Sequence, residues 1–459
     1  PYPSGVGLHA GHPEGYTATD IVSRMKRMQG YNVLHPMGYD SFGLPAEQYA
    51  VQTGNNPNGF TQTNIKTFTK QLQELGFDYD WSKMIATSDP EFYHWTQWIF
   101  KQLYKDGYAK YVDMPVNWCE ELGTVLSNDE VIDGKSERGG YPVVRKNMKQ
   151  LCIDQAAFAE RLLEGLNEID WPESTKEMQR NWIGRSTGVE VQFEIVGGGK
   201  FSIFTTCIET IYGITFMVLA PDGDLVQELM PRIKNQDEVK AYIQETVSKS
   251  EMDRTELNKG KTGCRLEGIK AINPVNGKEV EVFIGDFVLA NYGTGAVMAV
   301  PSHDQRDFEY AIAHNIDRIQ VIEGQDVSEH AFEKQDYLGK GCKLINSEEF
   351  TGLTVEEAKV AITKKLVDMG IAKETVNYRF REWIFSRQRY WGEPVPIVHL
   401  EDGTDYVLPD EELPLILPEL EDYKGHNGKA PLENATEWKQ YNQNGVKGVR
   451  ETSTMPGSA

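Results

Sequence analysis

The period of the hydrophobic pattern changes twice along this chain of 459 residues, and that change constrains its fold most. From about residue 187 apolar and polar residues alternate, which is the spacing of a half-buried β-strand. One face of the first such run carries Val189, Val191, Phe193 and Ile195, and three glycines follow at 197–199. Farther along, Asn276 and Gly277 within residues 272–284 are a strong hairpin signal. We therefore predict a β-rich domain over residues 187–376.

The segment before this region alternates helix and strand signals instead. Helical spacing of apolar residues ends at Gly30, and residues 31–34 are predicted to form a short strand. A second helix is predicted to begin with Asp89 as N-cap and Pro90 in its first turn, and to end at Gly107. Its apolar stripe, expected to face the core, comprises Phe92, Trp95, Ile99 and Leu103. This alternation predicts a parallel sheet.

Aromatic and basic character returns after about residue 376, and an acidic stretch dotted with proline follows over 401–421. A chain of this length is expected to form two or three domains. The reversal of the pattern predicts one domain interrupted by another. Because the chain begins with Pro1 and ends in a polar run, it is interpreted as a fragment at both ends.

Composition and charge narrow the class of protein. With 39% hydrophobic and 25% charged residues, the composition is that of a folded soluble protein, expected in the cytoplasm. The formal charge of −22 argues against extensive phosphate binding, although an acidic protein can carry a local basic channel. The five cysteines form no CxxC pair, which argues against a disulfide framework and a zinc ribbon.

A short HxGH element, His9 to His12, follows a turn and precedes a predicted helix. A helix N-terminus presents N–H groups and a positive dipole end to phosphate. Gly11 allows a nucleotide to approach the backbone, and both histidines can donate to a triphosphate. Taken alone, the element is also compatible with two ordinary histidines.

The wider context, PYPSGVGLHAGHPEGYTATDI followed by HPMGYDSFGLPAEQYA, resembles class I aminoacyl-tRNA synthetases of the bacterial leucyl branch. The resemblance implies that His9, Gly11 and His12 bind ATP, with His9 and His12 acting in adenylation. It also implies that Asp40 holds the α-ammonium group of leucine and that Tyr2 lines the same pocket. Asp40 could instead be a turn-forming residue after a strand.

The segment YRFREWIFSRQRYWGEP resembles the family's return strand and active-site floor. Ser386 is expected to contact the amino acid and Glu393 the ATP, with Trp391 a further contact. The alternative is a basic aromatic patch for RNA, formed by Arg381, Arg387 and Arg389. The run GVRETSTMPGSA resembles the approach to the rest of the nucleotide fold.

Two motifs of the β-rich region, TTCIET and GTGAVMAVPSHDQRDFEYA, resemble the editing domain shared by leucyl, isoleucyl and valyl enzymes. The resemblance implies that Asp307 binds the ammonium group of a mischarged amino acid, with Asp304 in support. Thr205 and Thr206 would bond near the scissile ester, and Thr210 would exclude leucine. Such a site is needed because one methylene discriminates by only about 1–3 kcal/mol. The alternative interpretation is that the threonines are ordinary strand residues and that Asp304, Arg306 and Asp307 form a surface charge cluster.

The sequence departs from the family in three places. The editing motif is usually TTRPDT, and Cys207, Ile208 and Glu209 replace its middle, which puts editing competence in question. Cys119 stands without further cysteines where relatives carry a zinc quartet, so no structural zinc is predicted. No KMSKS-like loop follows, so poor adenylation of leucine is expected. Because only part of the parallel sheet of the nucleotide domain is present, with an unpaired edge, this domain is expected to be unstable.

These observations together predict an incomplete Rossmann-like α/β catalytic domain interrupted by a β-barrel-like α+β editing domain. We expect catalytic segments at 1–120 and 377–459, a connective module at 121–186 and editing at 187–376. The implied activity is leucine–tRNA ligase with hydrolytic editing, using ATP, Mg²⁺, leucine and tRNA(Leu), in a monomer without membrane association. The alternatives are an isoleucyl or valyl enzyme, or an editing-only or inactive RNA-binding fragment.

Overall fold

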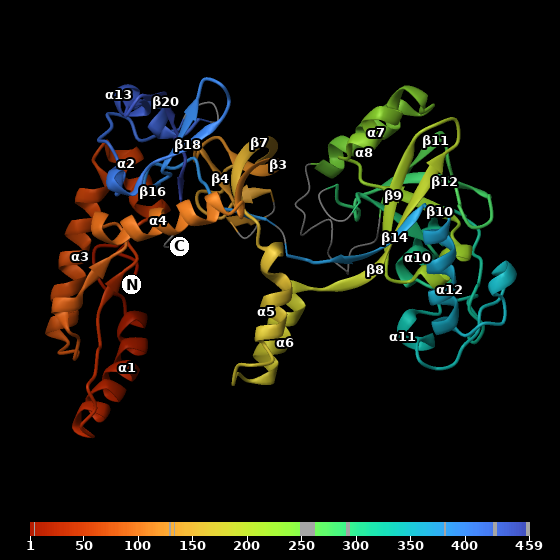
Figure 1. Ribbon diagram of the computed structural model, residues 1–459, viewed down its shortest axis with the longest axis horizontal. Coiled ribbons are helices and arrows are strands. Elements are labelled where there is room, and N and C mark those ends of the chain that lie inside the picture. The colour runs from red at the N-terminus through yellow and green to blue at the C-terminus, as the bar shows by residue number, and fades with distance from the viewer. Residues whose placement is uncertain are drawn as a thin grey trace. The chain divides into compact units, whose positions relative to one another are not determined.

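The computed structural model describes residues 1–455 except residues 4, 128–129, 133, 248–261, 291–293, 381 and 426–428. The chain divides into two compact units (Figure 1). Unit 1 comprises Pro1–Phe158 and Arg381–Ala459, and unit 2 comprises Ala159–Phe380. One domain is thus interrupted by another, as the sequence predicts.

Unit 1 opens with helices around a short parallel sheet. The helices are α1 (Gly11–Met28), α2 (Leu44–Thr53), α3 (Pro57–Glu74) and α4 (Pro90–Lys105). Strands β1 (Gly38–Tyr39) and β2 (Ile85–Ala86) pair in parallel, with Tyr39 opposite Ala86. Their core contains Met37, Ile65, Phe68 and Leu72. The parallel pairing predicted for this segment is confirmed.

Unit 1 also contains two four-stranded antiparallel sheets and a short antiparallel pair of β5 (Val131–Ile132) and β6 (Lys135–Ser136). The first has the order β15 (Trp383–Ile384), β7 (Val144–Ile153), β3 (Ala109–Cys119), β4 (Thr124–Leu126). The second has the order β18 (Asp405–Val407), β17 (Ile397–Leu400), β20 (Val446–Arg450), β19 (Gln440–Gln443). A short pair joins β16 (Glu393–Pro394) to β21 (Thr454–Met455). Because β15 pairs with β7, the returning chain is added directly to the sheet that the first segment began.

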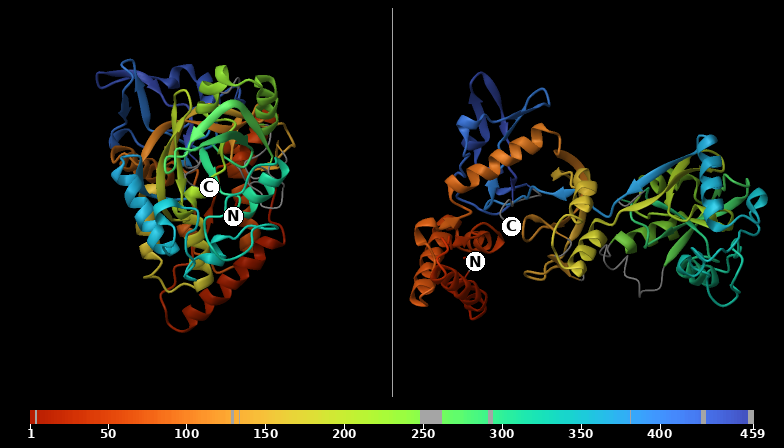
Figure 2. Two further views of the ribbon diagram at one scale, coloured as in Figure 1. Left: turned by 90° about the vertical axis from the view of Figure 1, so that its right-hand side faces the viewer. Right: turned by 60° about the horizontal axis from the view of Figure 1, so that its bottom comes forward.

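Unit 2 is built on a seven-stranded sheet with the order β13-β10-β12-β11-β8-β14, and β9 also pairs with β8. The strands are β8 (Ser186–Ile195), β9 (Lys200–Thr205), β10 (Phe216–Leu219), β11 (Gly263–Ile272), β12 (Glu279–Gly285), β13 (Ala296–Ala299) and β14 (Ala372–Asn377). Helices α5 (Ala159–Gly165) and α6 (Glu173–Ile183) precede the sheet. Helix α8 (Gln236–Val247) contacts β11, and α12 (Val355–Asp368) contacts β14 (Figure 2).

The predicted local signals of unit 2 are confirmed. The alternating face of β8 is at most 3% exposed, and the glycine turn at 197–199 has positive φ throughout. Gly277, with φ of 69°, lies in the turn between the antiparallel strands β11 and β12. Because glycine adopts positive φ without steric cost, these turns follow from local sequence alone.

Two expectations for unit 1 are wrong. Residues 31–34 form no strand, and the parallel pair starts only at Gly38. Tyr31 and Leu34 are 59% and 70% exposed, whereas Met37 and Tyr39 are buried. Strand pairing therefore begins where the chain meets the core, because a side chain of high β-propensity gains little without burial.

The aromatic stripe of α4 is also misplaced, although the helix has the predicted bounds and ends before Gly107. Trp95 and Ile99 are 61% and 53% exposed, and the buried face carries Tyr93, Gln97, Phe100 and Lys101. Gln97 exchanges hydrogen bonds with the backbone of Pro394 and Leu415, at 2.9 to 3.0 Å. A polar side chain is buried here because the returning chain supplies its partners.

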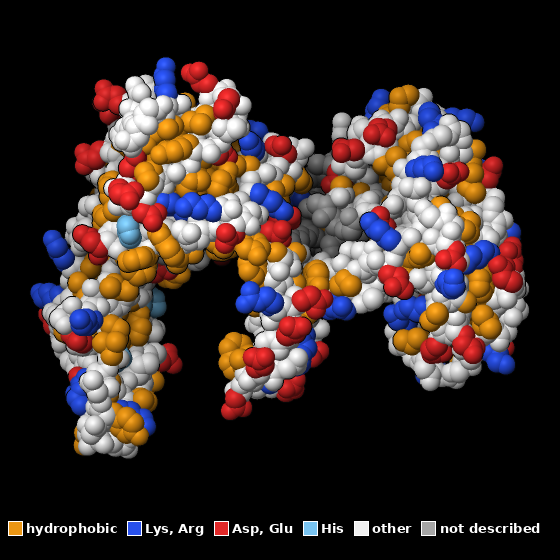
Figure 3. Space-filling model, in the orientation of Figure 1, with side chains coloured by type: hydrophobic (Ala, Val, Ile, Leu, Met, Phe, Trp, Pro, Cys, Tyr) orange, Lys and Arg blue, Asp and Glu red, His pale blue; other side chains and the backbone are white. Residues whose placement is uncertain are grey.

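Hydrophobic side chains reach the surface over α1 and α4 (Figure 3). They include Ile21, Val22, Met25 and Met28 of α1, which are 43% to 89% exposed. Within the described residues, no helix is both long and apolar enough to cross a membrane.

Candidate functional sites

The first candidate site lies at the start of α1, where His9, Gly11 and His12 are predicted to bind ATP. Nδ1 of His9 accepts the backbone N–H of Gly11 at 3.1 Å, and Nδ1 of His12 accepts that of His9 at 3.2 Å. The two ring centroids are 3.9 Å apart. Because both Nδ1 atoms are acceptors, each neutral ring carries its proton on Nε2. Burial, and secondly the nearby His9, lower the pKa of His12, so its ring acts as a neutral donor at pH 7.

Gly11 packs closely against the His9 ring. A Cβ at this position would lie 3.1 Å from Cε1 and 3.2 Å from Nδ1 of His9. A side chain would therefore need the exposed His9 ring to shift by a few tenths of an ångström. The sequence brings the three predicted residues together, with their donors at a helix N-terminus.

Asp40 directly follows β1, at the carboxyl end of a parallel strand. Ligands of α/β folds bind at this end of the sheet. Oδ1 of Asp40 accepts the hydroxyl of Thr87 at 3.4 Å, and its backbone N–H donates to the carbonyl of Pro1. The charge of Asp40, and secondly its hydrogen bond with Tyr2, raise the pKa of Tyr2. The structure thus places the Tyr2 hydroxyl beside Asp40.

Glu47, a residue to which the sequence assigns no role, bonds to the returning part of the chain (residues 377–459, the return segment) close to residues 40–43 (the Asp40 loop). Glu47 is 6% exposed, and its two carboxylate oxygens accept the backbone N–H groups of Tyr390 and Trp391, each at 3.1 Å. The indole of Trp391 donates to the carbonyl of Ser41 at 2.8 Å. The sequence signal was an acidic residue on an otherwise apolar helix face, since the neighbouring buried positions of α2 are Leu44, Ala46 and Ala50.

Ser386 and Glu393 are both buried in the return segment. The hydroxyl of Ser386, which is 2% exposed, accepts the N–H of Leu151 in β7 at 3.1 Å. Glu393 has no exposed surface and lies in β16 opposite Met455. The hydroxyl and the backbone N–H of Ser386 both bond to Leu151 and so join it to β7, whereas the indole of Trp391 bonds to Ser41, the residue after Asp40.

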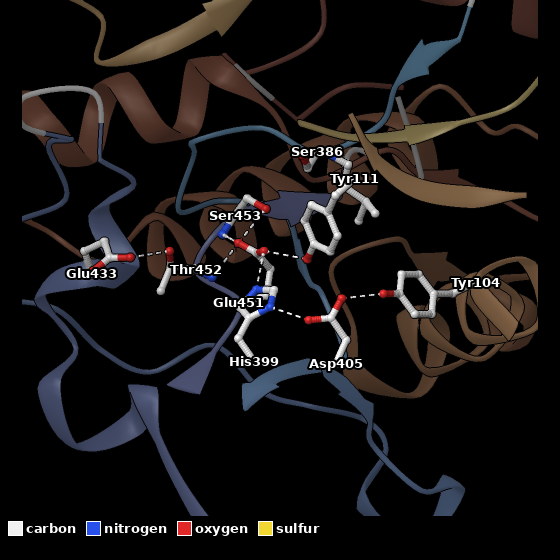
Figure 4. A network of polar contacts seen from close by, with 10 residues as sticks. Tyr104, Tyr111, Ser386, His399, Asp405, Glu433, Glu451, Thr452 and Ser453 are labelled. Atoms are coloured by element: carbon white, nitrogen blue, oxygen red, sulfur yellow. Dashed lines mark hydrogen bonds and ion pairs between the residues drawn. The ribbon is translucent and has the colours of Figure 1, made fainter. Parts of the chain in front are cut away.

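A half-buried polar network joins the second sheet of unit 1 to β3 and α4 (Figure 4). His399 lies between Asp405, with Nδ1 to Oδ1 at 2.6 Å, and Glu451, with Nε2 to Oε2 at 3.0 Å. Glu451 also accepts the hydroxyl of Tyr111 at 2.6 Å, and Asp405 that of Tyr104. Burial alone would raise the pKa of Glu451, but the bonds from His399 and Tyr111 hold it at about 2. The hydrogen bonds to Glu451 and Asp405 raise the pKa of His399.

The second candidate site lies in unit 2, in the loop that follows β9. The hydroxyl of Thr205 accepts the N–H of Cys207 at 3.0 Å, and that of Thr210 donates to the carbonyl of Cys207 at 2.8 Å. Lys359 of α12 donates to the carbonyl of Thr206 at 3.0 Å. Thr205 and Thr210 are buried, and Thr206 is half-buried. The predicted threonines therefore form one ordered turn.

Asp304 and Asp307 lie at the start of α10 (Gln305–Ala313). Asp304 is the N-cap, because Oδ1 accepts the N–H groups of Arg306 and Asp307 at 2.9 and 3.1 Å. Asp307 is 8% exposed, and its Oδ2 accepts the N–H of Val300 at 2.9 Å. Burial distinguishes Asp307 from a surface charge cluster. Asp304 keeps an ion pair with Arg306 at 3.5 Å, but its cap also supports the helix that carries Asp307.

His303 is a residue of this motif that the sequence analysis did not single out. Its Nε2 accepts the N–H of Val321, so Nδ1 carries the proton and donates to the carbonyl of Phe332, both at 3.0 Å. Burial lowers the pKa of His303 to about 4. A neutral ring with both nitrogens engaged has a packing role rather than an acid–base role. From sequence alone, a histidine beside two aspartates gives no sign of this.

Comparison with known proteins places both candidate sites in one family. The model of the leucyl-tRNA synthetase editing domain matches residues 180–367, and the model of class I tRNA synthetases (M) matches residues 1–121. Among solved structures, the chain is similar to the agnB2 LeuRS of Agrobacterium radiobacter K84 in a ternary complex with tRNA and LeuAMS, with a TM-score of 0.80 and 33% identity. This chain belongs to the leucyl-tRNA synthetase family. The similarity covers 100% of this chain and 54% of that LeuRS chain, so the chain spans about half its length.

The position of the family's zinc module can be inspected around Cys119. This thiol is fully buried at the end of β3, and burial raises its pKa. Over the ranges that the structure describes, no group of three or more His, Cys, Asp or Glu is placed to hold a metal ion. The lack of a structural zinc stays a prediction that metal analysis tests.

Proposed function

We propose that this chain provides leucine activation and post-transfer editing to a leucine–tRNA ligase. The observation that carries the proposal is the match of a class I synthetase segment and a leucyl editing domain within one chain. The geometry of the two sites supports it. Unit 1 contains two histidines at a helix N-terminus, whose Nδ1 atoms accept backbone N–H groups, and an aspartate at the end of a parallel strand. Unit 2 contains a threonine turn and a buried aspartate in the first turn of α10.

In unit 1 the proposed reaction is in-line attack of the leucine carboxylate on the α-phosphorus of ATP, with pyrophosphate leaving. His9 and His12 donate from Nε2 to the phosphate oxygens, where charge develops in the transition state. Asp40 holds the α-ammonium group, since an ionised carboxylate forms a charge-assisted bond with it. Trp391 and Tyr2 line the amino-acid pocket, and Glu47 positions Trp391. Ser386 and Glu393, predicted to contact leucine and ATP, act in this proposal through the buried floor beneath the pocket.

In unit 2 the proposed reaction is hydrolysis of the ester between a noncognate amino acid and tRNA(Leu). Water attacks the ester carbonyl, and the products are the free amino acid and the free tRNA hydroxyl. Asp307 binds the ammonium group, and Thr205 and Thr206 orient the ester and the water. Thr210 excludes the leucine side chain. Asp304 supports Asp307 as the cap of its helix.

The remaining assignments follow from the family. We propose leucine, ATP and tRNA(Leu) as ligands of a cytoplasmic monomer, with residues 121–186 as the connective module between catalytic segments 1–120 and 377–459 and the editing domain 187–376. Mg²⁺ is expected to arrive with ATP and to neutralise its phosphates. Because no described residues form a metal-binding group, no protein ligand is assigned to it.

The test measures the two activities separately on the full chain. Editing is followed as deacylation of isoleucyl-tRNA(Leu) beside leucyl-tRNA(Leu). We expect loss of isoleucine with sparing of leucine, and a rate lower by roughly thirtyfold to 160-fold for Asp307→Ala, since a buried charged contact is worth about 2–3 kcal/mol. Asp317→Ala is the matched control, because Asp317 is an exposed acid of the same unit. Equal deacylation by the Asp307→Ala and Asp317→Ala variants would contradict the editing assignment.

Leucine activation is measured as leucine-dependent exchange of pyrophosphate into ATP, with Asp40→Ala as the variant. Exchange with leucine that is lost in this variant supports the synthetic site. Deacylation without any exchange would leave an editing module alone. Exchange that prefers isoleucine or valine would assign the chain to another branch.

A further inference from the structure

Glu209 is a buried acidic residue of the Thr205–Thr210 turn, here called the editing loop, and the proposed editing mechanism does not use it. It has no exposed surface and lies in the 3-10 helix η4 (Ile208–Gly213), between Thr206 and Thr210. Its Oε1 accepts the hydroxyl of Tyr337 at 3.2 Å. Its Oε2 has no hydrogen-bond partner among the described residues. Burial raises the pKa of Glu209, and a hydrogen bond from its own backbone N–H and the charge of Lys359 oppose this shift more weakly.

This carboxyl group is costly to keep in the core. Two other residues of η4, Ile208 and Ile211, belong to the hydrophobic core of unit 2. A buried polar group with one bond and one unsatisfied oxygen is less favourable than an apolar side chain of similar size. The free energy of folding therefore does not explain why position 209 is a glutamate. Its directional hydrogen bond to Tyr337 does explain it. A single bond with defined geometry fixes the position of the loop in a way that apolar packing does not.

The partner of Glu209 connects the loop to the second editing motif. Tyr337 ends α11 (Lys334–Tyr337), is 1% exposed and also bonds to Cys207 in the loop. Its ring packs edge-on against His303, with centroids 6.1 Å apart. His303 precedes Asp304, and its two nitrogens are engaged by the backbone. A continuous path thus runs from η4 through Tyr337 and His303 to the cap of α10.

We propose that Glu209 and Tyr337 are a positioning pair that sets the Thr205–Thr210 turn in register with Asp307. The proposal rests on the proposed editing function. The pair does not touch the ester. It holds the threonine hydroxyls and the aspartate at the separation at which both meet the same substrate, and misplacement lowers the rate of the bound complex.

The test compares variants by kcat and KM for deacylation of isoleucyl-tRNA(Leu), and by the thermal midpoint of unit 2. Tyr337→Phe and Glu209→Met should each lower kcat about tenfold with unchanged KM, and together should lower it no further. Glu209→Met should leave the thermal midpoint unchanged or raised, because it removes a buried unsatisfied group. Glu209→Gln keeps an acceptor oxygen for Tyr337 and should stay within about threefold of the unmodified chain.

Tyr242→Phe is the matched control, since it removes a bonded tyrosine hydroxyl on α8. It should deacylate like the unmodified chain. The positioning role is refuted if Glu209→Met retains full kcat, if its kcat loss only follows a drop in thermal midpoint, or if Glu209→Gln fails as badly as Glu209→Met.

A second readout keeps the proposal testable if the unmodified chain deacylates no substrate, an outcome that contradicts the editing function itself. Cys207 lies in the loop and is half-buried. Its alkylation by iodoacetamide, followed by peptide mass spectrometry, reports loop position without any substrate. Faster alkylation in Tyr337→Phe and Glu209→Met, but not in Glu209→Gln or Tyr242→Phe, supports the positioning pair. Equal rates in all five proteins overturn it.

Discussion

Removing the carboxylate of Glu47 should uncouple the return segment from the Asp40 loop. Glu47 accepts two backbone N–H groups, from Tyr390 and Trp391, in a site that leaves it only 6% exposed. In the Glu47→Ala variant both donors stay buried without an acceptor. Each such donor costs about 1–3 kcal/mol, so we expect the local opening free energy to fall by about 3 kcal/mol.

The assay is amide hydrogen exchange, because the two N–H groups are themselves the donors. A loss of about 3 kcal/mol corresponds to roughly a hundredfold faster exchange of these amides. Glu47→Gln should lie between, since its oxygen accepts one N–H while its amide faces the other as a second donor. The fluorescence of Trp391, whose indole donates to Ser41, should change in parallel.

The control is Glu74→Ala, which removes an exposed carboxylate that pairs with Lys70 at 3.8 Å. An exposed pair of this kind contributes about 0–1 kcal/mol, so exchange at residues 390–391 should not change. Unchanged exchange in Glu47→Ala as well would refute the reasoning. It would mean that packing of Trp391, rather than the two hydrogen bonds, holds the segment.

Four further predictions concern other parts of the chain. Gly188→Ala should lower the free energy of unfolding of unit 2 by about 2–3 kcal/mol, measured as a lower thermal midpoint, because its Cβ would lie 2.3 Å from the carbonyl oxygen of Thr205. Asp304→Ala should cost about 1 kcal/mol and fray the start of α10 in hydrogen exchange, since it removes the N-cap. Because the pKa of His399 is raised in the folded state, its charged form stabilises unit 1. This stabilisation is complete below about pH 6.5 and is lost as the pH rises through the folded pKa. A denaturation series from pH 6 to 9 should therefore show a falling free energy of unfolding, and His399→Gln should abolish this fall. The lowered pKa of Glu451 acts oppositely, stabilising above pH about 4.5, so stability lost only below that pH should identify its contribution.

Local sequence signals predicted the β8–β9 region and the hairpin of unit 2 and two of the helices of unit 1. The alternation in β8, the glycine turn before β9 and the hairpin at Gly277 all depend on residues within a few positions of one another. The start of α4 at Pro90 and its end before Gly107 depend on backbone constraints of single residues. These features need no knowledge of distant contacts.

The burial of α4 could not be predicted in this way. A helical pattern shows which residues share a face, but not which face another segment will cover. The return segment places carbonyl groups against Gln97 and a carboxylate near Lys101, and so buries two polar residues while Trp95 and Ile99 stay exposed. The partners come from residues about 300 positions away, and no local signal contains them.

In the candidate sites, too, some residues could be predicted from local sequence, whereas the roles of others depend on distant segments. The sequence by itself determined the grouping of His9, Gly11 and His12, because a four-residue element at a helix start fixes its own geometry. Only the tertiary structure decided the parts played by Glu47, Glu209 and His303. Each is a polar group whose meaning depends on burial and on donors or acceptors supplied by distant segments. Glu47, for instance, meets donors 343 and 344 residues away. A buried polar side chain is stable only with such partners, so its role is set by the fold and not by its neighbours in sequence.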